Sequence, residues 1–518
     1  MKTSNFVVYV TFLMSGNFVV AQTAPPAIEW QRDFGGTNVE TLFRAQQASD
    51  GGYILGGQSY PGTLGNKTNA GFGLVDYWVV KTDASGNKLW DNSYGGTNYD
   101  FLQSVVPTSD GGCLLGGYSN SGLSGNKTNA SFGGEDYWLV KVDADGNKQW
   151  EKSFGGTADD EFYSMQQTSD GGYILGGRSY SAVSGNKTNA PFGGGDFWVV
   201  KVDTNGVKQW DHSYGGTASD VINSLQQTSD GGYILGGTST SGISGNKTNT
   251  FFGVIDYWLV KADTNGVKQW DHSYGGTNGD YLYSVQQTSD GGYILGGASN
   301  SGPSGNKAGT NWGLYDYWLV KVDTNGNKQW DQSYGGTSSD FLYNVRQTDD
   351  GGYLLGGDSR SGISGNKTNA SFGVEDFWLV KVDADGNKQW EQSYGGTGDD
   401  YLRSLQPTGD GGYILGGYSV SGISGNKTNA NYGGNDYWVV KLAGVPLSPT
   451  LTISLAGSNN VALSWPTNAS GFTLQSALGL SPPAAWSNSP DAPVIVGQQY
   501  MVTNAASNSL QIYRLKKP

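Results

Sequence analysis

The sequence predicts an all-β protein in which one four-stranded unit is repeated seven times and followed by a smaller β domain. Short runs rich in Val, Leu, Tyr and Trp alternate with turns rich in Gly, Asp and Asn. No segment shows the 3.6-residue periodicity of a helix. The third observation is the repeat itself. Tryptophan recurs every 60 residues, at Trp30, Trp90, Trp150, Trp210, Trp270, Trp330 and Trp390.

The other landmarks of the unit repeat in phase with these tryptophans. Residues 31–450 hold seven units without insertion or deletion, and they contain 78 of the 83 glycines. A fixed period of this length indicates a solenoid, a propeller or an array. Each unit carries a D-G-G turn, a GNKTNA-type segment and a D-[YF]-W triplet. The triplets begin at Asp76, Asp136, Asp196, Asp256, Asp316, Asp376 and Asp436.

Each unit contains four candidate strands. Two short hairpins, Ser109–Gly112 and Asp143–Gly146, join the first two and the last two strands of the second unit, with glycines that can take positive φ. A longer loop, Ser119–Glu135, joins the middle pair. Paired glycines such as Gly116 and Gly117 leave room for a neighbouring backbone or aromatic ring. The four strands of this unit are Phe101–Thr108, Cys113–Tyr118, Tyr137–Asp143 and Lys148–Phe154.

The two ends of the array favour a closed ring. The last unit stops after its third strand, Tyr437–Leu442, whereas a free copy of the fourth strand, Ile28–Gln31, precedes the first unit. A chain offset by one strand can pair its N-terminal strand into the last sheet, which removes the exposed edges of an open array. The sequence therefore predicts a seven-bladed β-propeller over residues 28–443, closed by the N-terminal strand.

These motifs resemble a known family. The unit S-Y-G-G-T-x-x-D, D-G-G-Y-I-L-G-G-x-S and D-Y-W-L-V-K-V-D-x-x-G resembles the repeat of secreted bacterial seven-bladed β-propellers. The resemblance covers the seven units and implies the propeller fold, but it implies no single biochemical activity. The long GNKTNA-containing loop departs from the family pattern, so no ligand is implied for it.

The segments outside the repeats have their own signatures. Lys2, an apolar run over residues 6–14 and small residues before Gln22 are typical of a secretion signal over residues 1–21, with a short linker at 22–27. A Pro-containing linker spans residues 444–450. Residues 451–518 alternate like a small immunoglobulin- or fibronectin-like β-sandwich, similar to modules at the C-termini of secreted bacterial proteins. Its expected strands are Leu451–Leu455, Val461–Trp465, Phe472–Ser476, Gln499–Thr503 and Leu510–Leu515.

Charge and composition exclude several kinds of partner. Thirty-one Lys and Arg against 45 Asp and Glu give a net charge of −14, which disfavours nucleic acid and anionic membrane surfaces. After the signal no segment reaches the roughly 18 apolar residues of a membrane span. The single cysteine, Cys113, cannot form an internal disulfide. The sequence therefore predicts a secreted or cell-surface bacterial protein, and it sets no oligomeric state.

The long loops define the face on which we expect a ligand, because all seven emerge at the same end of the blades as the G-G-T-x-x-D links. Aromatic side chains in the loops can stack on sugar faces, or each can fix its loop to the blade below. Arg178 and Arg360 break the repeat on this face. The loop aromatic residues are Phe72, Phe132, Phe192, Phe252, Trp312, Phe372 and Tyr432.

Other polar groups have local explanations. The Asp before each aromatic-Trp pair could ligate calcium with loop carbonyls, but an Asx-type turn at the strand entry explains it more simply. The Asp-x-Asp-Gly turns lack the further oxygen ligands of a calcium loop. His212 and His272 occupy equivalent positions of adjacent units and fit surface substitutions better than a metal pair. No cofactor is therefore predicted.

Three functional hypotheses follow. The first is a non-enzymatic binding protein for extracellular polysaccharide or cell-surface glycan, with sites repeated around the ring. The second is a structural or adhesive surface protein. The third is a glycan hydrolase or lyase that uses acids breaking the repeat, such as Glu135 and Glu375 together with Asp358. Glu135 and Glu375 come from the second and sixth units, so direct contact between them is not expected.

Overall fold

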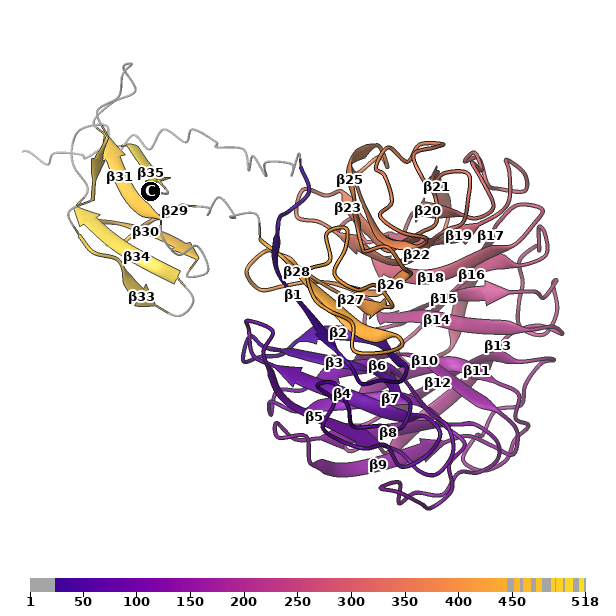
Figure 1. Ribbon diagram of the computed structural model, residues 1–518. Helices are drawn as coiled ribbons and strands as arrows, with labels where there is room; N and C mark the ends of the chain where they lie inside the picture. Colours follow the sequence, from indigo (N-terminus) through magenta and orange to yellow (C-terminus); the bar gives the residue numbers. More distant parts are fainter. Residues whose placement is uncertain are drawn as a thin grey trace, which may run out of the picture. The chain divides into compact units, whose positions relative to one another are not determined.

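The computed structural model describes residues 24–444, 451–456, 460–466, 472–477, 486–489, 491–496, 499–505 and 512–516. The regular structure of these residues is β strand throughout, without a helix (Figure 1). None of them therefore belongs to a helix that could span a membrane. The expected signal at residues 1–21 and most of the expected linker, residues 445–450, lie outside the described residues. The repeats and the C-terminal part form separate compact units.

Six antiparallel four-stranded sheets follow one another along the chain. Sheet one is β2 (Glu40–Gln47), β3 (Tyr53–Ser59), β4 (Asp76–Thr82) and β5 (Lys88–Tyr94). Sheet two is β6 (Asp100–Pro107), β7 (Cys113–Ser119), β8 (Asp136–Val142) and β9 (Lys148–Phe154). Sheet three is β10 (Asp160–Gln167), β11 (Tyr173–Ser179), β12 (Asp196–Val202) and β13 (Lys208–Tyr214). The strands predicted for the second unit agree with these bounds to within one residue.

The next three sheets repeat this order. Sheet four is β14 (Asp220–Gln227), β15 (Tyr233–Ser239), β16 (Asp256–Ala262) and β17 (Lys268–Tyr274). Sheet five is β18 (Asp280–Gln287), β19 (Tyr293–Ser299), β20 (Asp316–Val322) and β21 (Lys328–Tyr334). Sheet six is β22 (Asp340–Gln347), β23 (Tyr353–Ser359), β24 (Asp376–Val382) and β25 (Lys388–Tyr394).

Sheet seven combines the two ends of the repeat region. It contains β26 (Asp400–Pro407), β27 (Tyr413–Ser419) and β28 (Asp436–Leu442), and its fourth strand is β1 (Ile28–Phe34). β1 pairs antiparallel with β28, with Phe34 opposite Tyr437 and Ile28 opposite Leu442. In Figure 1 the orange strands β26–β28 accordingly lie beside the indigo β1.

Each sheet packs on the next through the same aromatic contact. The ring of Tyr77 in β4 lies 4.7 Å from that of Trp138 in β8, and the Tyr77 hydroxyl donates to the Trp138 carbonyl at 3.0 Å. Sheet seven packs on sheet one in this way, since the Tyr437 hydroxyl donates to the Trp78 carbonyl at 2.9 Å. Such ring pairs add about 0.5–1.5 kcal/mol beyond the burial of area. The first strands of consecutive sheets also contact one another, and β26 contacts β2.

The paired glycines of the second strand are required by close approach. A Cβ on Gly117 would lie 1.9 Å from the Phe101 carbonyl oxygen and 2.5 Å from the Tyr77 hydroxyl of the preceding sheet. A Cβ on Gly116 would lie 2.7 Å from the Phe162 ring of the following sheet. The predicted reason for these glycines therefore holds, because backbone and aromatic rings occupy the space that a side chain needs.

The C-terminal unit contains two small sheets. One has the order β29 (Thr452–Leu455), β30 (Asn460–Pro466), β34 (Gln499–Ala505) and β33 (Val494–Val496), and the other β32 (Ser487–Asn488), β31 (Thr473–Ala477) and β35 (Ile512–Lys516). Leu463, Trp465, Leu474 and Val502 bring both sheets into one buried cluster. The five expected strands are present in the described residues, although residues 510–511 of the last strand lie outside them. The short β32 and β33 were not predicted.

Candidate functional site

The long loops contact the links between sheets, as predicted for a common face. The Asn126 side chain of the second loop accepts from Gly95 N at 2.9 Å, and Asn126 N donates to the Gly95 carbonyl at 3.0 Å. Lys127 is buried and its Nζ lies 5.7 Å from the centre of the Trp138 ring. Equivalent lysines in every unit lie over the third-strand tryptophan in the same way. Each long loop is therefore fixed to its sheet by buried polar contacts.

The predicted loop aromatic residues both contact protein and remain accessible. A Cβ on Gly125 would lie 2.8 Å from Phe72 Cβ, so the base of the Phe72 side chain packs against this glycine of the next loop. The other loop aromatic residues pack against the equivalent glycines in the same way. The outer part of each ring stays in solvent, and Phe72, the most accessible of these phenylalanines, is 43% exposed. The exposed members are Phe72, Phe132, Phe192, Trp312, Phe372 and Tyr432, whereas Phe252 is half-buried.

A second apolar position of the same loops was missed by the sequence analysis. Leu123 is 67% exposed and Ile423 is 69% exposed, although both belong to a loop of polar residues. Solvent-exposed apolar groups that gather on one face mark an interaction surface. The signal was present in the repeat, because an apolar residue precedes the Ser-Gly-Asn segment in most units. The exposed residues at this position are Leu123, Val183, Ile243, Ile363 and Ile423, and in the first unit the exposed Leu64 stands one repeat position further along.

The Asp that opens each third strand accepts backbone hydrogen bonds, as the turn interpretation predicts. Asp136 Oδ2 accepts from Phe132 N at 2.6 Å and from Gly133 N at 3.3 Å. Burial, with a smaller contribution from the charge of Asp160, raises the pKa of Asp136 to about 7. No group of three or more His, Cys, Asp or Glu among the described residues is arranged to hold a metal ion. This Asp therefore fixes the turn through which the long loop enters the third strand.

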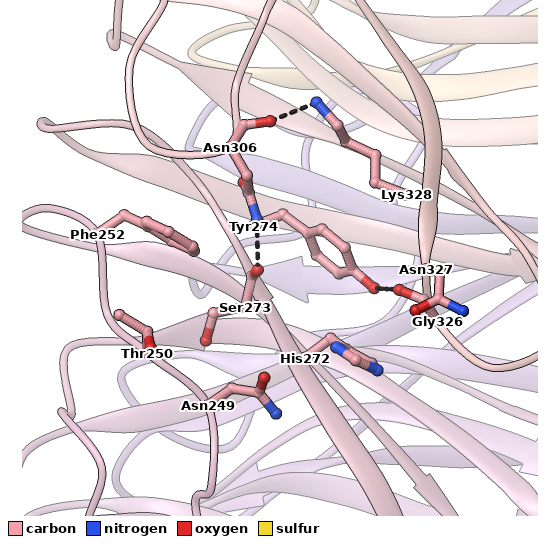
Figure 2. Close-up of a pocket in the computed structure, with 10 residues that line it drawn as sticks. All are labelled: Asn249, Thr250, Phe252, His272, Ser273, Tyr274, Asn306, Gly326, Asn327 and Lys328. Atoms are coloured by element: carbon pink, nitrogen blue, oxygen red, sulfur yellow. Dashed lines mark hydrogen bonds between the residues drawn. The ribbon is translucent and has the colours of Figure 1, made fainter.

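An open groove of about 240 Å³ lies where the fourth loop meets sheet five. Figure 2 shows Asn249, Thr250 and Phe252 on one side and Asn327 and Lys328 on the other. His272, Ser273 and Tyr274 of β17 lie between them. The groove therefore combines the half-buried ring of Phe252 with amide, hydroxyl, imidazole and ammonium groups.

Hydrogen bonds connect the polar walls of the groove to one another. The Tyr274 hydroxyl donates to the Gly326 carbonyl at 2.5 Å, and Asn306 Nδ2 donates to the Ser273 carbonyl at 2.9 Å. His272 Nε2 contacts the Asn325 carbonyl at 3.0 Å. His272 thus lies against the turn of the next sheet, as expected for a surface substitution. Among the lining residues only Phe252 belongs to the predicted site.

The two predicted arginines each form an ion pair. Arg178 Nη2 lies 2.6 Å from Glu161 Oε2, and the same carboxylate accepts from the Tyr163 hydroxyl. Arg360 Nε lies 2.6 Å from Glu375 Oε2 and Arg360 Nη2 lies 3.5 Å from the Tyr401 hydroxyl. Both arginines are therefore ion-paired with carboxylates of their own sheets. Glu161 was not recognised in the sequence, although the other six units carry uncharged residues at its repeat position.

A third departure from the repeat forms a buried charged cluster. Arg403 Nη1 lies 3.0 Å from Asp358 Oδ2, and the guanidinium lies 4.1 Å from the centre of the Tyr343 ring. Arg403 Nη2 also donates to the Tyr418 hydroxyl at 3.1 Å. Burial lowers the pKa of Arg403, but the charge of Asp358 raises it, and the net result is a raised pKa. Arg403 was not predicted from the sequence, although it stands out there because the other six units carry an aromatic or amide residue at its position.

The acids considered for catalysis have separate surroundings. The Glu375 carboxylate is 3% exposed and paired with Arg360. Burial, and then the charges of Glu161 and Asp159, raise the pKa of Glu135 to about 7. Glu135 therefore interacts with sheet three and Glu375 with sheets six and seven, which agrees with the expectation that they do not meet.

Comparisons with known proteins give weak relationships. No known protein-family profile matches the chain. The regulatory protein FlaEY of Caulobacter vibrioides is 25% identical over 179 residues, which is 33% of this chain and 19% of that protein. The chain thus spans about a fifth of this relative's length.

Solved structures with similar architecture share little sequence with the chain. The WD40 domain of Neurospora crassa Pan2 is 10% identical, with a TM-score of 0.43, over 78% of this chain and 90% of that one. PorZ, a surface component of the type-IX secretion system of Porphyromonas gingivalis, is 8% identical, with a TM-score of 0.39, over 94% of this chain and 58% of that one.

Proposed function

We propose that this protein is a secreted or cell-surface, non-enzymatic binding protein that holds extracellular polysaccharide or cell-surface glycan through the long loops. In this proposal the seven sheets close a propeller ring through β1, and residues 451–518 form an accessory β-sandwich. The pairing of β1 with β28 and the packing of sheet seven on sheet one support the ring.

The observation that carries the proposal is the groove at Phe252. Sugars present flat C–H faces and a rim of hydroxyls, and an aromatic ring beside amide and hydroxyl side chains complements both. Phe252, Asn249 and Asn327 supply this combination in one open groove. Its open shape suits one or two sugar units of a long chain rather than an enclosed small molecule.

Several weak sites repeated around the ring would together give a high overall affinity for a polymer. Six other loops carry an aromatic side chain at the position of Phe252, and most also expose an aliphatic residue. A polymer that contacts several such sites at once gains affinity from the high local concentration of its remaining units. The rigid attachment of each loop through its buried lysine limits the ordering cost of binding.

A glycan array probed with the full-length protein, in calcium and in chelator, tests the proposal. We expect binding to a polysaccharide class in both conditions, because no calcium-dependent group is needed at the loops. A protein that binds no glycan would instead be a structural or adhesive scaffold. Release of reducing ends that is lost in Glu135→Gln or Glu375→Gln would make it a hydrolase or lyase.

A further inference from the structure

Two arginines on the first strands stand at positions where the other units carry uncharged residues. Arg44 lies on β2 of sheet one and Arg346 lies on β22 of sheet six. β26 of sheet seven contacts both strands, so the two arginines come from the strands that flank it. Both side chains are half-buried.

Neither guanidinium has a counter-ion within the part of the chain that the structure describes. Among the described residues, the arginines that form ion pairs are Arg178, Arg360 and Arg403. Arg44 Nη1 donates only to the backbone carbonyls of Phe43, at 3.1 Å, and Arg403, at 3.4 Å. Arg346 Nη1 donates to the Val345 carbonyl at 2.9 Å. Each guanidinium carries five N–H donors, so most of its donors are left for another partner.

The repeat explains why the side chain at position 346 does not bond to the backbone of the next sheet, sheet seven. The equivalent glutamine of sheet five, Gln286, accepts from Gln347 N of sheet six at 2.8 Å, and Gln226 accepts from Gln287 N in the same way. The residue of sheet seven that faces position 346 is Pro407, which has no N–H. A glutamine at 346 would therefore lack this bond, and the arginine that replaces it is free to bind elsewhere.

Arg44 also replaces a residue with a bonding role. Ser284 and Ser404, at the position of Arg44 in sheets five and seven, accept from the backbone of the next sheet at 3.2 and 3.1 Å. Arg44 instead extends back toward sheet seven, where it reaches the Arg403 carbonyl. Two departures from the repeat, in different sheets, thus bring two cations to the same strand.

The two charges are unfavourable without an anion. Burial lowers the pKa of Arg44 to about 10, and burial with the charge of Arg44 lowers that of Arg346 to about 10. Both groups remain cationic at neutral pH, and half-buried like charges are stabilised when an anion neutralises them. Guanidinium groups bind planar or tetrahedral oxyanions through paired N–H donors.

We propose that Arg44 and Arg346 form a binding site for an oxyanion, either a carboxylate or a phosphate, between β22, β26 and β2. The site is independent of the long loops, so it can exist whether or not the loops bind glycan. Its ligand can be a free inorganic ion or the acid group of a larger molecule, and the two share the chemistry that the arginines recognise.

Isothermal titration and thermal unfolding of the full chain with inorganic phosphate, acetate and glucuronate test this site. We expect saturable binding of at least one anion, and at least tenfold weaker binding in Arg44→Ser and in Arg346→Gln. These substitutions install residues that the repeat carries elsewhere, so both variants should fold. Arg32→Gln, which changes a cation on β1 stacked over Trp30 to the residue of sheet six, is the matched control and should bind as the wild type does.

The anions separate the two sources of ligand. Preference for phosphate indicates a free ion or a phosphate ester, whereas preference for glucuronate over acetate indicates an acidic sugar. In anion-free buffer, both arginine variants should unfold at a higher temperature than the wild type, because one unpaired charge is removed. Absence of saturable binding to all three anions, or equal affinity in the arginine variants and Arg32→Gln, would overturn the proposal.

Discussion

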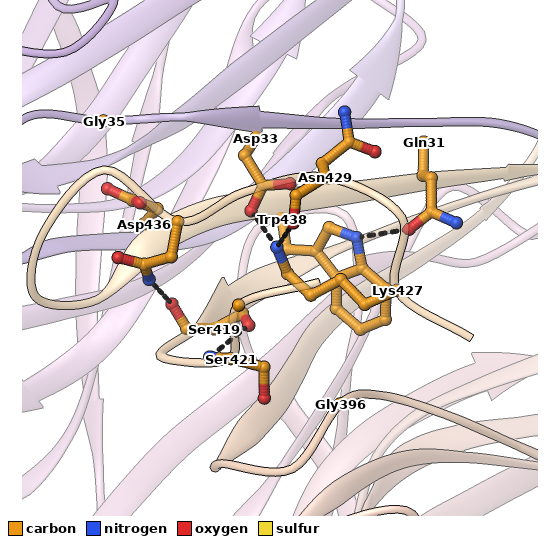
Figure 3. Close-up of polar contacts among 12 residues, drawn as sticks. Gln31, Asp33, Gly35, Gly396, Ser419, Ser421, Lys427, Asn429, Asp436 and Trp438 are labelled. Atoms are coloured by element: carbon orange, nitrogen blue, oxygen red, sulfur yellow. Dashed lines mark hydrogen bonds and ion pairs between the residues drawn. The ribbon is translucent and has the colours of Figure 1, made fainter. Parts of the chain in front are cut away.

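Lys427 Nζ lies 2.6 Å from Asp33 Oδ1, and neither side chain is more than 1% exposed (Figure 3). The two residues are 394 positions apart, on the last long loop and on β1. Burial raises the pKa of Asp33 to about 6 although Lys427 lowers it. This ion pair joins the N-terminal strand to the rest of the seventh sheet. Asp33 is the only acid that the seven units carry at its repeat position.

Two further changes on β1 accompany this acid. The other six fourth strands carry Lys, an acid and Ser where β1 has Ile28, Gln31 and Asp33. In those strands the Lys pairs with the acid, as Lys208 does with Asp211 at 2.8 Å. With the Lys replaced by Ile28, an acid at position 31 would lack that partner, and the acid at position 33 reaches Lys427 instead.

Replacing Asp33 with Ser should therefore destabilise the repeat unit by about 3–5 kcal/mol, because a buried Lys427 is left without its counter-ion. Urea unfolding followed by tryptophan fluorescence measures the change. The double variant Asp33→Ser, Gln31→Asp returns the acid to the position used in the other sheets and should recover part of the loss. Equal stability of Asp33→Ser and the wild type would contradict this explanation of β1.

The Gly-Gly links are predicted to tolerate no side chain. A Cβ on Gly155 would lie 1.8 Å from Asp136 Oδ1 and 2.8 Å from Asp160 Oδ2. Gly155→Ala should cost more than about 2 kcal/mol, as overpacking of a buried site does. Gly122→Ala is the control, because nothing lies within 4 Å of its Cβ position. Thermal unfolding of the two variants should show a lower midpoint for Gly155→Ala alone.

Stability should fall as pH rises toward neutrality. The folded protein holds protons on the third-strand aspartates at pH values where the unfolded chain has released them, because burial raises their pKa values from 3.8. Each such group lowers the free energy of unfolding by up to about 1.4 kcal/mol per pH unit between the two pKa values. The pKa is raised to about 6 for Asp76 and Asp376, and to about 7 for Asp136, Asp196, Asp256, Asp316 and Asp436.

Urea midpoints at pH 5 and pH 7.5 measure this slope, and the midpoint at pH 5 should be higher. Groups with lowered pKa values, such as Asp170 at about 2, lose their stabilising contribution only below about pH 4 and leave this interval unchanged. Asp256→Asn removes one titrating group and should reduce the difference between the two midpoints. A midpoint that rises from pH 5 to pH 7.5 would show that these aspartates are ionised in the folded protein.

The Asp358–Arg403 pair should behave as a unit. Arg403→Asn leaves Asp358 buried without its cation and should lower stability by about 3–5 kcal/mol. The double variant Asp358→Thr, Arg403→Asn installs the residues that sheet four carries at both positions, Thr238 and Asn223. Its loss should be smaller than that of Arg403→Asn. Additive losses in a double-mutant cycle by urea unfolding would mean that the two side chains do not interact.

The fold could be predicted from the sequence because of the repeat. All landmarks of a unit recur with the same 60-residue period, so a shift of one residue would put every landmark out of phase. The repeat also hid the charged residues that depart from it. Glu161, Arg346 and Arg403 stand at positions filled by uncharged residues in most other units, and only a position-by-position comparison distinguishes them. The ion-pair partners of Glu161 and Arg403 lie on neighbouring strands, which spacing along the chain does not indicate.

The loop residues show a different limit. Their recurrence predicted the aromatic residues, but whether a ring is accessible depends on how its loop folds over the next glycine, as Phe72 does over Gly125. The groove at Phe252 depends on Lys328 and Asn327 of sheet five, which lie about 75 residues further along the chain. Tertiary packing therefore decides which of the repeated rings has polar neighbours.

Binding of the polysaccharide selected on the glycan array, by the wild type and by one triple variant, tests the central proposal most directly. In Phe132→Ala, Phe192→Ala, Phe252→Ala three loop rings are removed, and isothermal titration should show at least tenfold weaker binding. The control Val207→Asn, Val267→Asn removes two exposed apolar groups from the short hairpins and installs the residue of the other units. It should bind like the wild type. Unchanged binding by the triple variant would contradict a role of the long loops in glycan recognition.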